Sequence, residues 1–161
     1  MPKENKKLIY ITAYSRSGST LLDIILGNRA DVFSSGELFR LTTSGWMNDE
    51  FCSCHTRVSK CSLWSKVKKE WEKKTGATPQ EYAALQNKFE RIRSYFILCK
   101  EKKHRSTDYQ RYLFLTENLL QIIFSSTQTN IIVDSSKMPM RALAISNLEN
   151  IDILYICLLY T

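Results

Sequence analysis

The sequence lacks any long apolar run and any apolar segment near its start. No stretch of about 18 apolar residues occurs, which is the length that a membrane-spanning helix requires. The first seven residues are polar and charged, and no apolar core of a signal peptide follows them. We therefore expect a cytoplasmic protein with no transmembrane segment.

The sequence also has few prolines and no even set of cysteines that would indicate a disulfide scaffold. The chain has 3 prolines, and no repeat, low-complexity tract or proline-rich linker divides it. Its 161 residues, of which 43% are hydrophobic, can bury one core, so we predict a single domain over residues 1–161. The 5 cysteines form an odd set, which argues against a scaffold held only by disulfides.

The net charge of +7 favours an anionic ligand, but a nucleotide, a sulfated glycan, nucleic acid and a membrane surface all fit it. No recognisable nucleic-acid-binding module is present, so nucleic acid is not expected as a partner. Two basic clusters are typical of solvated helix faces and ends, and an acidic acceptor is a weaker hypothesis for them: Lys66, Lys68, Lys69, Lys73 and Lys74, and Lys100, Lys102, Lys103, His104 and Arg105.

Short apolar segments predict an α/β fold. Strands are expected over residues 7–13, 31–34 and 130–133, and a final buried strand over 151–160. The first strand is followed by a turn and then by a helix with one apolar face, which Gly27 and Asn28 end with a left-handed residue. That face contains Leu21, Leu22, Ile25 and Leu26.

Further helices are predicted after residue 78. Thr78 and Pro79 form a helix start, and one continuous apolar stripe follows them. Two more helices are expected over residues 108–124 and 138–148. The stripe consists of Tyr82, Leu85, Phe89, Ile92, Phe96 and Cys99.

The loop between the first strand and its helix has the parts of an anion site. A glycine permits close backbone approach, the helix start carries a partial positive charge, and an arginine and hydroxyls add donors. The alternative is a serine-rich turn with an ordinary helix cap. A Walker A loop is disfavoured because Ser19 stands at its lysine position and Ala13 at its first glycine. The candidate donor-binding residues are Ser15, Arg16, Ser17, Gly18, Ser19 and Thr20.

With this loop in place, the sequence resembles the sulfotransferase superfamily. The similarity rests on ITAYSRSGSTLL (11–22), SSGELF (34–39), CSC…CSLW (52–64) and IIVDSSK (131–137), in that order. The resemblance implies a three-layer P-loop NTPase-like parallel sheet flanked by helices, with residues 51–125 as a mainly helical insertion carrying a cysteine-containing loop. It also implies 3′-phosphoadenylyl sulfate (PAPS) as co-substrate, transfer of its sulfonate to a hydroxyl or amine acceptor, and no required metal.

The resemblance assigns roles to individual residues. Arg16 would stabilise the bridging oxygen of the leaving phosphate, and Lys137 would assist it. Glu37, in a Gly-Glu pair like that of protein-tyrosine sulfotransferases, would be the base, although a carboxylate at a helix start is the plainer explanation. Asp134, Ser135 and Ser136 would orient the acceptor. They could instead cap the next helix, or end a Walker B strand with a magnesium-binding aspartate.

Cys52, Cys54, His55 and Cys61 leave three interpretations open: a tetrahedral zinc site, a disulfide, or unpaired structural thiols. The spacing lacks the usual paired Cys-x-x-Cys, and we expect no metal.

Two other functions also stay open, a P-loop kinase or nucleotidase and a non-catalytic nucleotide- or glycan-binding relic. The family's 3′-phosphate-binding arginine and serine would follow a strand like 152–158, where this chain ends at Thr161, so we expect C-terminal truncation.

Overall fold

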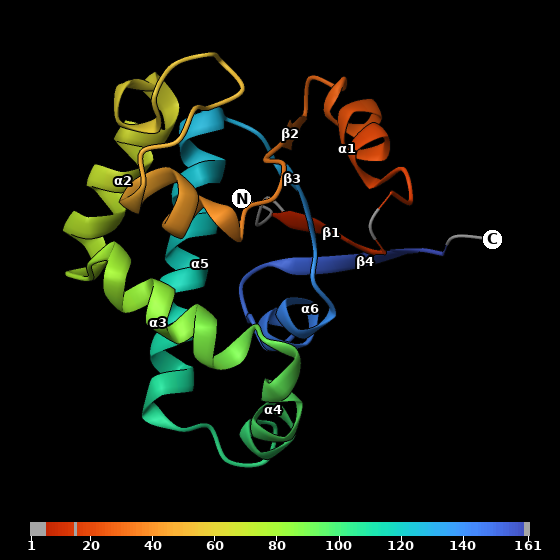
Figure 1. Ribbon diagram of the computed structural model, residues 1–161, viewed down its shortest axis with the longest axis vertical. Coiled ribbons are helices and arrows are strands. Elements are labelled where there is room, and N and C mark those ends of the chain that lie inside the picture. The colour runs from red at the N-terminus through yellow and green to blue at the C-terminus, as the bar shows by residue number, and fades with distance from the viewer. Residues whose placement is uncertain (1–5, 15, 160–161) are drawn as a thin grey trace, which may run out of the picture.

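The computed structural model describes residues 6–14 and 16–159, and it has an α/β architecture built on a four-stranded sheet (Figure 1). All neighbouring strands are parallel, in the order β2-β3-β1-β4. The predicted α/β fold with a parallel sheet flanked by helices is thus confirmed. The strands are β1 (Lys7–Ala13), β2 (Val32–Ser34), β3 (Ile131–Lys137) and β4 (Asp152–Leu158).

The helices divide unevenly between the two faces of the sheet. Most of them follow β2 and precede β3, whereas α1 connects β1 to β2 and α6 connects β3 to β4 (Figure 1). Short π and 3-10 segments lie at 41–47, 58–60 and 92–94. The α-helices are α1 (Ser19–Gly27), α2 (Ser62–Thr75), α3 (Pro79–Phe89), α4 (Tyr95–Glu101), α5 (Thr107–Thr127) and α6 (Pro139–Ile145).

The alternation of side chains along β1 separates two hydrophobic clusters. Leu8 and Tyr10 point into the large core made with α2, α3, α5 and α6. Ile9 and Ile11 point to the opposite face, where Leu22 of α1 packs on them. The sheet is therefore covered on both faces, as parallel sheets require. No helix in the described part of the chain is both long and apolar enough to cross a membrane.

The helix start at Thr78 is confirmed, but the continuous apolar stripe after it is wrong beyond Phe89. The Thr78 hydroxyl accepts a hydrogen bond from Glu81 N at 3.2 Å, with Pro79 in the first turn. The helix then ends at Phe89, and Ile92 and Phe96 are 83% and 76% exposed. The hydroxyl of Ser94 donates to the Lys88 carbonyl at 2.6 Å, which stabilises the turn that redirects the chain.

Two details of α1 also differ from expectation. Asn28 ends the helix at φ −74, so no left-handed stop is formed. Gly27 is required for another reason: a Cβ added there would lie 2.6 Å from the Ser34 Cβ, so glycine permits the close approach of α1 to β2. Leu21 and Ile25, predicted on the buried face, are 63% and 55% exposed.

The final strand is confirmed as a strand, but it is not buried along its length. Strand β4 lies at the edge of the sheet and pairs with β1. Leu154 is 50% exposed and Tyr155 is 42% exposed, and because neighbouring strand residues point to opposite faces, both faces of the sheet are partly open at this edge. Tyr160, the last residue of the predicted strand, lies outside the described residues.

Candidate functional site

The loop after β1 turns sharply into α1 through two left-handed residues. Arg16 has φ 66 and Gly18 has φ 80. Gly18 is also the residue that precedes the first turn of α1, and no atom lies within 4 Å of the position that its Cβ would take. Glycine is therefore favoured here by the backbone angle and not by crowding. Ser15 of the predicted loop lies outside the described residues.

The side chains of this loop leave hydrogen-bonding capacity unused. The Ser17 hydroxyl is buried and has no partner in the described structure, and no side chain caps the start of α1. Ser19 is buried, whereas Arg16 and Thr20 are exposed. Because the first N–H groups of a helix have no intrahelical acceptor, the loop presents donors and a partial positive charge to an incoming anion.

Glu37 and Lys137, 100 residues apart in sequence, form an ion pair at the carboxyl edge of the sheet. Lys137 Nζ lies 2.6 Å from Glu37 Oε1, with both side chains partly exposed. Glu37 follows β2 after Gly36 at φ 66, and Lys137 ends β3 in the same left-handed region. Arg40 Nη1 lies 4.0 Å from the other oxygen of Glu37, Oε2, and no other cation of the described residues forms an ion pair with Oε2. The sequence had assigned a catalytic role to each residue but had not predicted this contact.

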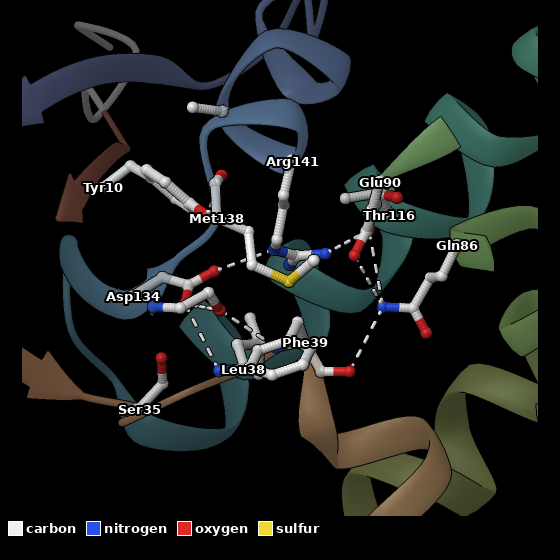
Figure 2. Close-up of polar contacts among 12 residues, drawn as sticks. Tyr10, Ser35, Leu38, Phe39, Gln86, Glu90, Thr116, Asp134, Met138 and Arg141 are labelled. Carbon is white, nitrogen blue, oxygen red and sulfur yellow. Dashed lines mark hydrogen bonds and ion pairs between the residues drawn. The ribbon is translucent and has the colours of Figure 1, made fainter. Parts of the chain in front are cut away.

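The end of β3 holds the segment that carries Glu37. Ser135 N donates to the Gly36 carbonyl at 2.9 Å, and Phe39 N donates to the Ser136 hydroxyl at 3.1 Å. Leu38 N donates to Asp134 Oδ1 at 3.2 Å (Figure 2). The register between β1 and β3 shifts at this point, and such irregularities re-aim a strand's side chains.

Asp134, predicted to contact the acceptor, is fully buried and bound by protein groups. Its Oδ1 also accepts from the Ser136 backbone at 3.0 Å and from the Ser136 hydroxyl, and its Oδ2 accepts from Arg141 Nε at 3.2 Å. Ser135 is likewise buried, and its hydroxyl donates to Asp23 Oδ2 at 2.8 Å. The Asp134 carboxylate, the Ser136 hydroxyl and the backbone N–H of Ser135 therefore position the loop of Glu37. None of these three residues lines the cavity that adjoins Glu37.

Arg141 and Glu90 complete this network, and sequence reasoning missed both. Arg141 Nη1 lies 2.5 Å from Glu90 Oε1, and the two side chains are 1% and 4% exposed (Figure 2). Tyr112 donates to the same oxygen at 2.8 Å. Burial raises the pKa of Glu90, against the opposing attraction of Arg141. No motif separates a buried arginine from a surface one in a short helix, so the sequence carried no signal for this pair.

A cavity of about 720 Å³ adjoins Glu37. Asp23 of α1 lines it, and the buried Asp23 Oδ1 has no partner in the described structure. Burial raises the pKa of Asp23, although the Ser135 hydroxyl, which donates to Oδ2, acts to lower it. The remaining walls include Ser35, Gly36 and the segment of Cys52, Cys54 and Cys61.

The structure thus brings together only some of the predicted site residues. Glu37 lines the cavity and contacts Lys137, and the end of β3 holds Glu37 in place. Arg16, Gly18 and the other described loop residues do not line this cavity, and no ion pair involves Arg16 in the described part of the chain. The loop and the Glu37 pair nevertheless follow strands whose carboxyl ends form one edge, since β1 and β2 both flank β3.

Comparison of the chain with protein-family models, with curated proteins and with solved structures found no match.

Proposed function

We propose that this chain is a sulfotransferase domain of P-loop-like fold, which transfers the sulfonate of PAPS to a hydroxyl or amine acceptor. The observation that carries the proposal is the 2.6 Å contact between Glu37 and Lys137 at the carboxyl edge of the parallel sheet. The contact joins a candidate base, Glu37, which follows β2, to a candidate cation, Lys137, which ends β3. Strand β3 lies beside β1, and β1 leads into the glycine loop.

The donor would bind at the loop that opens α1. The left-handed angles of Arg16 and Gly18 expose backbone N–H groups, and the unpartnered Ser17 hydroxyl can donate to a phosphate oxygen. The exposed guanidinium of Arg16 can make a bidentate contact with the same group. Ser19 and Thr20 would add hydroxyl donors, and no metal is required for this mode of binding.

In the reaction, the acceptor oxygen would attack the donor sulfur while Glu37 takes the acceptor's proton. A new O–S bond forms as the bond between the sulfur and the bridging oxygen breaks, and adenosine 3′,5′-bisphosphate leaves. Lys137 and Arg16 would stabilise the charge that develops on the bridging oxygen. Lys137 holds Oε1 of Glu37, so Oε2, 4.0 Å from Arg40, is the oxygen available to the acceptor.

Asp134, Ser135 and Ser136 would act as positioning residues. Their bonds to Gly36, Leu38 and Phe39 fix the backbone on both sides of Glu37. A base must be held within hydrogen-bond reach of the proton that it removes, so loss of these bonds would lower turnover without removing a reacting group. We therefore assign the three residues to the geometry of Glu37 and not to direct contact with the acceptor.

Calorimetric titration tests the donor site. We expect adenosine 3′,5′-bisphosphate and PAPS to bind without magnesium, and Arg16→Ala to weaken both at least tenfold. Arg29→Ala is the matched control, since Arg29 is an exposed arginine paired with Asp31 in the turn after α1. A preference for magnesium-ATP would instead favour a kinase, and equal affinities of the two variants would refute the role of Arg16.

Turnover of PAPS over a panel of phenol, sugar and amine acceptors tests the base. We expect Glu37→Gln to lose transfer while its affinity for adenosine 3′,5′-bisphosphate stays within about twofold of wild type, because the amide cannot take the acceptor's proton but its oxygen can still accept a hydrogen bond from Lys137. Glu50→Gln is the control, since Glu50 lines the same cavity and pairs with Arg40 at 3.6 Å. Undiminished transfer by Glu37→Gln would exclude Glu37 as the base.

A further inference from the structure

Three cysteines converge on one wall of the cavity. The Sγ atoms of Cys52, Cys54 and Cys61 all lie within 4.8 Å of one another. Cys61 is buried, Cys52 is partly buried and Cys54 is exposed, so the group extends from the interior to the surface. His55, the fourth residue of the sequence-based hypothesis, does not belong to this group of mutually close ligand atoms.

Local backbone structure brings Cys52 and Cys54 together. Cys52 N donates to the Thr56 carbonyl at 2.8 Å, and His55 N donates to the Cys52 carbonyl at 2.9 Å. These bonds close a tight turn in which His55 adopts the left-handed φ of 62. An isolated antiparallel bridge between Phe51 and Arg57 closes the base of the turn. The two thiols are thus held on one compact hairpin.

A second set of contacts ties this hairpin to the segment of Cys61. The Asp49 carboxylate accepts bonds from Ser59 N at 2.8 Å and from the Ser59 hydroxyl at 2.9 Å. Arg57 Nη1 donates to the Asp49 carbonyl at 2.9 Å. Cys61 follows two residues after Ser59 and directly precedes α2. The site is therefore preorganised by protein contacts alone.

The spacing of the sulfurs fits a single tetrahedral ion. Zinc binds thiolates at about 2.3 Å, which places two sulfurs of one tetrahedron about 3.8 Å apart, within the observed limit. A disulfide would bring only two of the three sulfurs to about 2.05 Å and would leave the third without a role. Three convergent soft ligands favour zinc over the hard cations that carboxylates bind.

We propose that Cys52, Cys54 and Cys61 bind one Zn²⁺ ion as thiolates, releasing three protons, with a water molecule in the fourth position. The exposed side of Cys54 leaves that position open to solvent, at the edge of the cavity that Glu37 also lines. Such an ion would tie the hairpin of residues 52–56 to the start of α2 and so fix this wall of the cavity. The proposal does not depend on the proposed sulfonate transfer.

The test counts thiols in reduced, chelator-treated protein before and after addition of zinc. The chain has 5 cysteines, all of them free in the structure, and we expect one equivalent of zinc to leave only 2 of them fast-reacting towards a disulfide reagent in the folded protein. Cobalt in place of zinc should give an intense thiolate-to-metal absorption band. Cys52→Ser, Cys54→Ser and Cys61→Ser should each lose the band and weaken zinc binding at least tenfold.

Cys99→Ser and Cys157→Ser are the matched controls, because both residues are exposed cysteines outside the cluster. They should keep the wild-type zinc stoichiometry and band. Three results would each overturn the proposal: no zinc-dependent protection in a sample with native circular dichroism, undiminished zinc binding in all three cluster variants, or loss of two thiols without metal, which would indicate a disulfide.

Discussion

Replacing Arg141 by methionine tests whether the buried ion network stabilises the fold. The arginine lies 2.5 Å from Glu90 and 3.2 Å from Asp134, and all three side chains are almost completely buried. Methionine fills much of the same space but leaves two carboxylates without a counter-ion. Removing one partner of a buried pair destabilises by about 3–5 kcal/mol, against a typical total stability of about 5–15 kcal/mol.

Urea unfolding, followed by circular dichroism, measures this loss as a change in the free energy of unfolding. The matched control is Arg105→Met, since Arg105 pairs with Glu149 at 2.8 Å on the surface. Exposed ion pairs contribute about 0–1 kcal/mol, so Arg141→Met should lower the free energy of unfolding several times more than Arg105→Met does. The double variant Arg141→Met with Glu90→Gln should recover part of the loss, because one uncompensated charge is removed with the arginine.

The pH dependence supplies a second criterion. Burial raises the pKa of Glu90, and Arg141 opposes that rise in the wild type. A folded-state pKa raised above the unfolded value favours folding at low pH, and this contribution is lost as the pH rises towards the folded pKa. Without Arg141 the rise is larger, so the deficit of Arg141→Met should shrink as the pH falls from neutral towards the ordinary glutamate pKa. A deficit below 1 kcal/mol, or one that does not change over this range, would refute the reasoning.

Three further predictions concern the backbone around the site. Gly27→Ala should destabilise by about 1–3 kcal/mol in urea, because the new Cβ would lie 2.6 Å from the Ser34 Cβ, and Ser34→Gly should relieve it. Gly18→Ala should destabilise by about 1–2 kcal/mol through its φ of 80 and should also weaken the calorimetric affinity for adenosine 3′,5′-bisphosphate. Ser136→Ala should lower the turnover of PAPS while sparing its affinity, because Phe39 N loses its acceptor.

Gly76→Ala is the control for Gly18→Ala, because it separates the effect of backbone strain from the effect on ligand binding. Gly76 has φ 65 and open space around its Cβ position, like Gly18, but it ends α2 far along the chain from the loop. Both alanine variants should lose similar stability, and only Gly18→Ala should lose affinity. Equal affinities of Gly18→Ala and the wild type would contradict a phosphate role for the loop.

For Ser136→Ala, a change in PAPS affinity with normal turnover would contradict a positioning role.

Sequence patterns predicted the strands and the helix starts well because those features depend on neighbouring residues. The first strand occupies residues 7–13 as expected, and Thr78 caps α3 through a bond to Glu81 only three residues away. Burial depends on distant residues and was predicted less well. Ile25 has the spacing of a core residue but is 55% exposed, because the sheet face beneath α1 contacts only part of the helix.

The candidate site shows the same division. The motif around Glu37 and the one ending at Lys137 are visible as short segments, but their contact depends on β2 pairing with β3 across the long helical stretch. The network of Glu90 and Arg141 depends on four separate elements, α3, α5, β3 and α6, and neither residue lies in a motif. Asp134 was predicted to lie just beyond a strand over 130–133, whereas β3 extends to Lys137 and Asp134 is buried within it. Only the packed structure decides whether such a side chain faces a ligand or the core.

The position of Asp134 links the stability of the fold to the geometry of the site. One of its oxygens accepts from Arg141 in the helical core, and the other accepts from Leu38, next to Glu37 (Figure 2). A charged carboxylate is costly to bury without donors, and here donors from both sides meet that requirement. The loop of Glu37 is therefore held by an anion that the core itself keeps in place. Asp134 does not line the cavity, but it holds the loop of Glu37 from the same strand, β3, that provides Lys137.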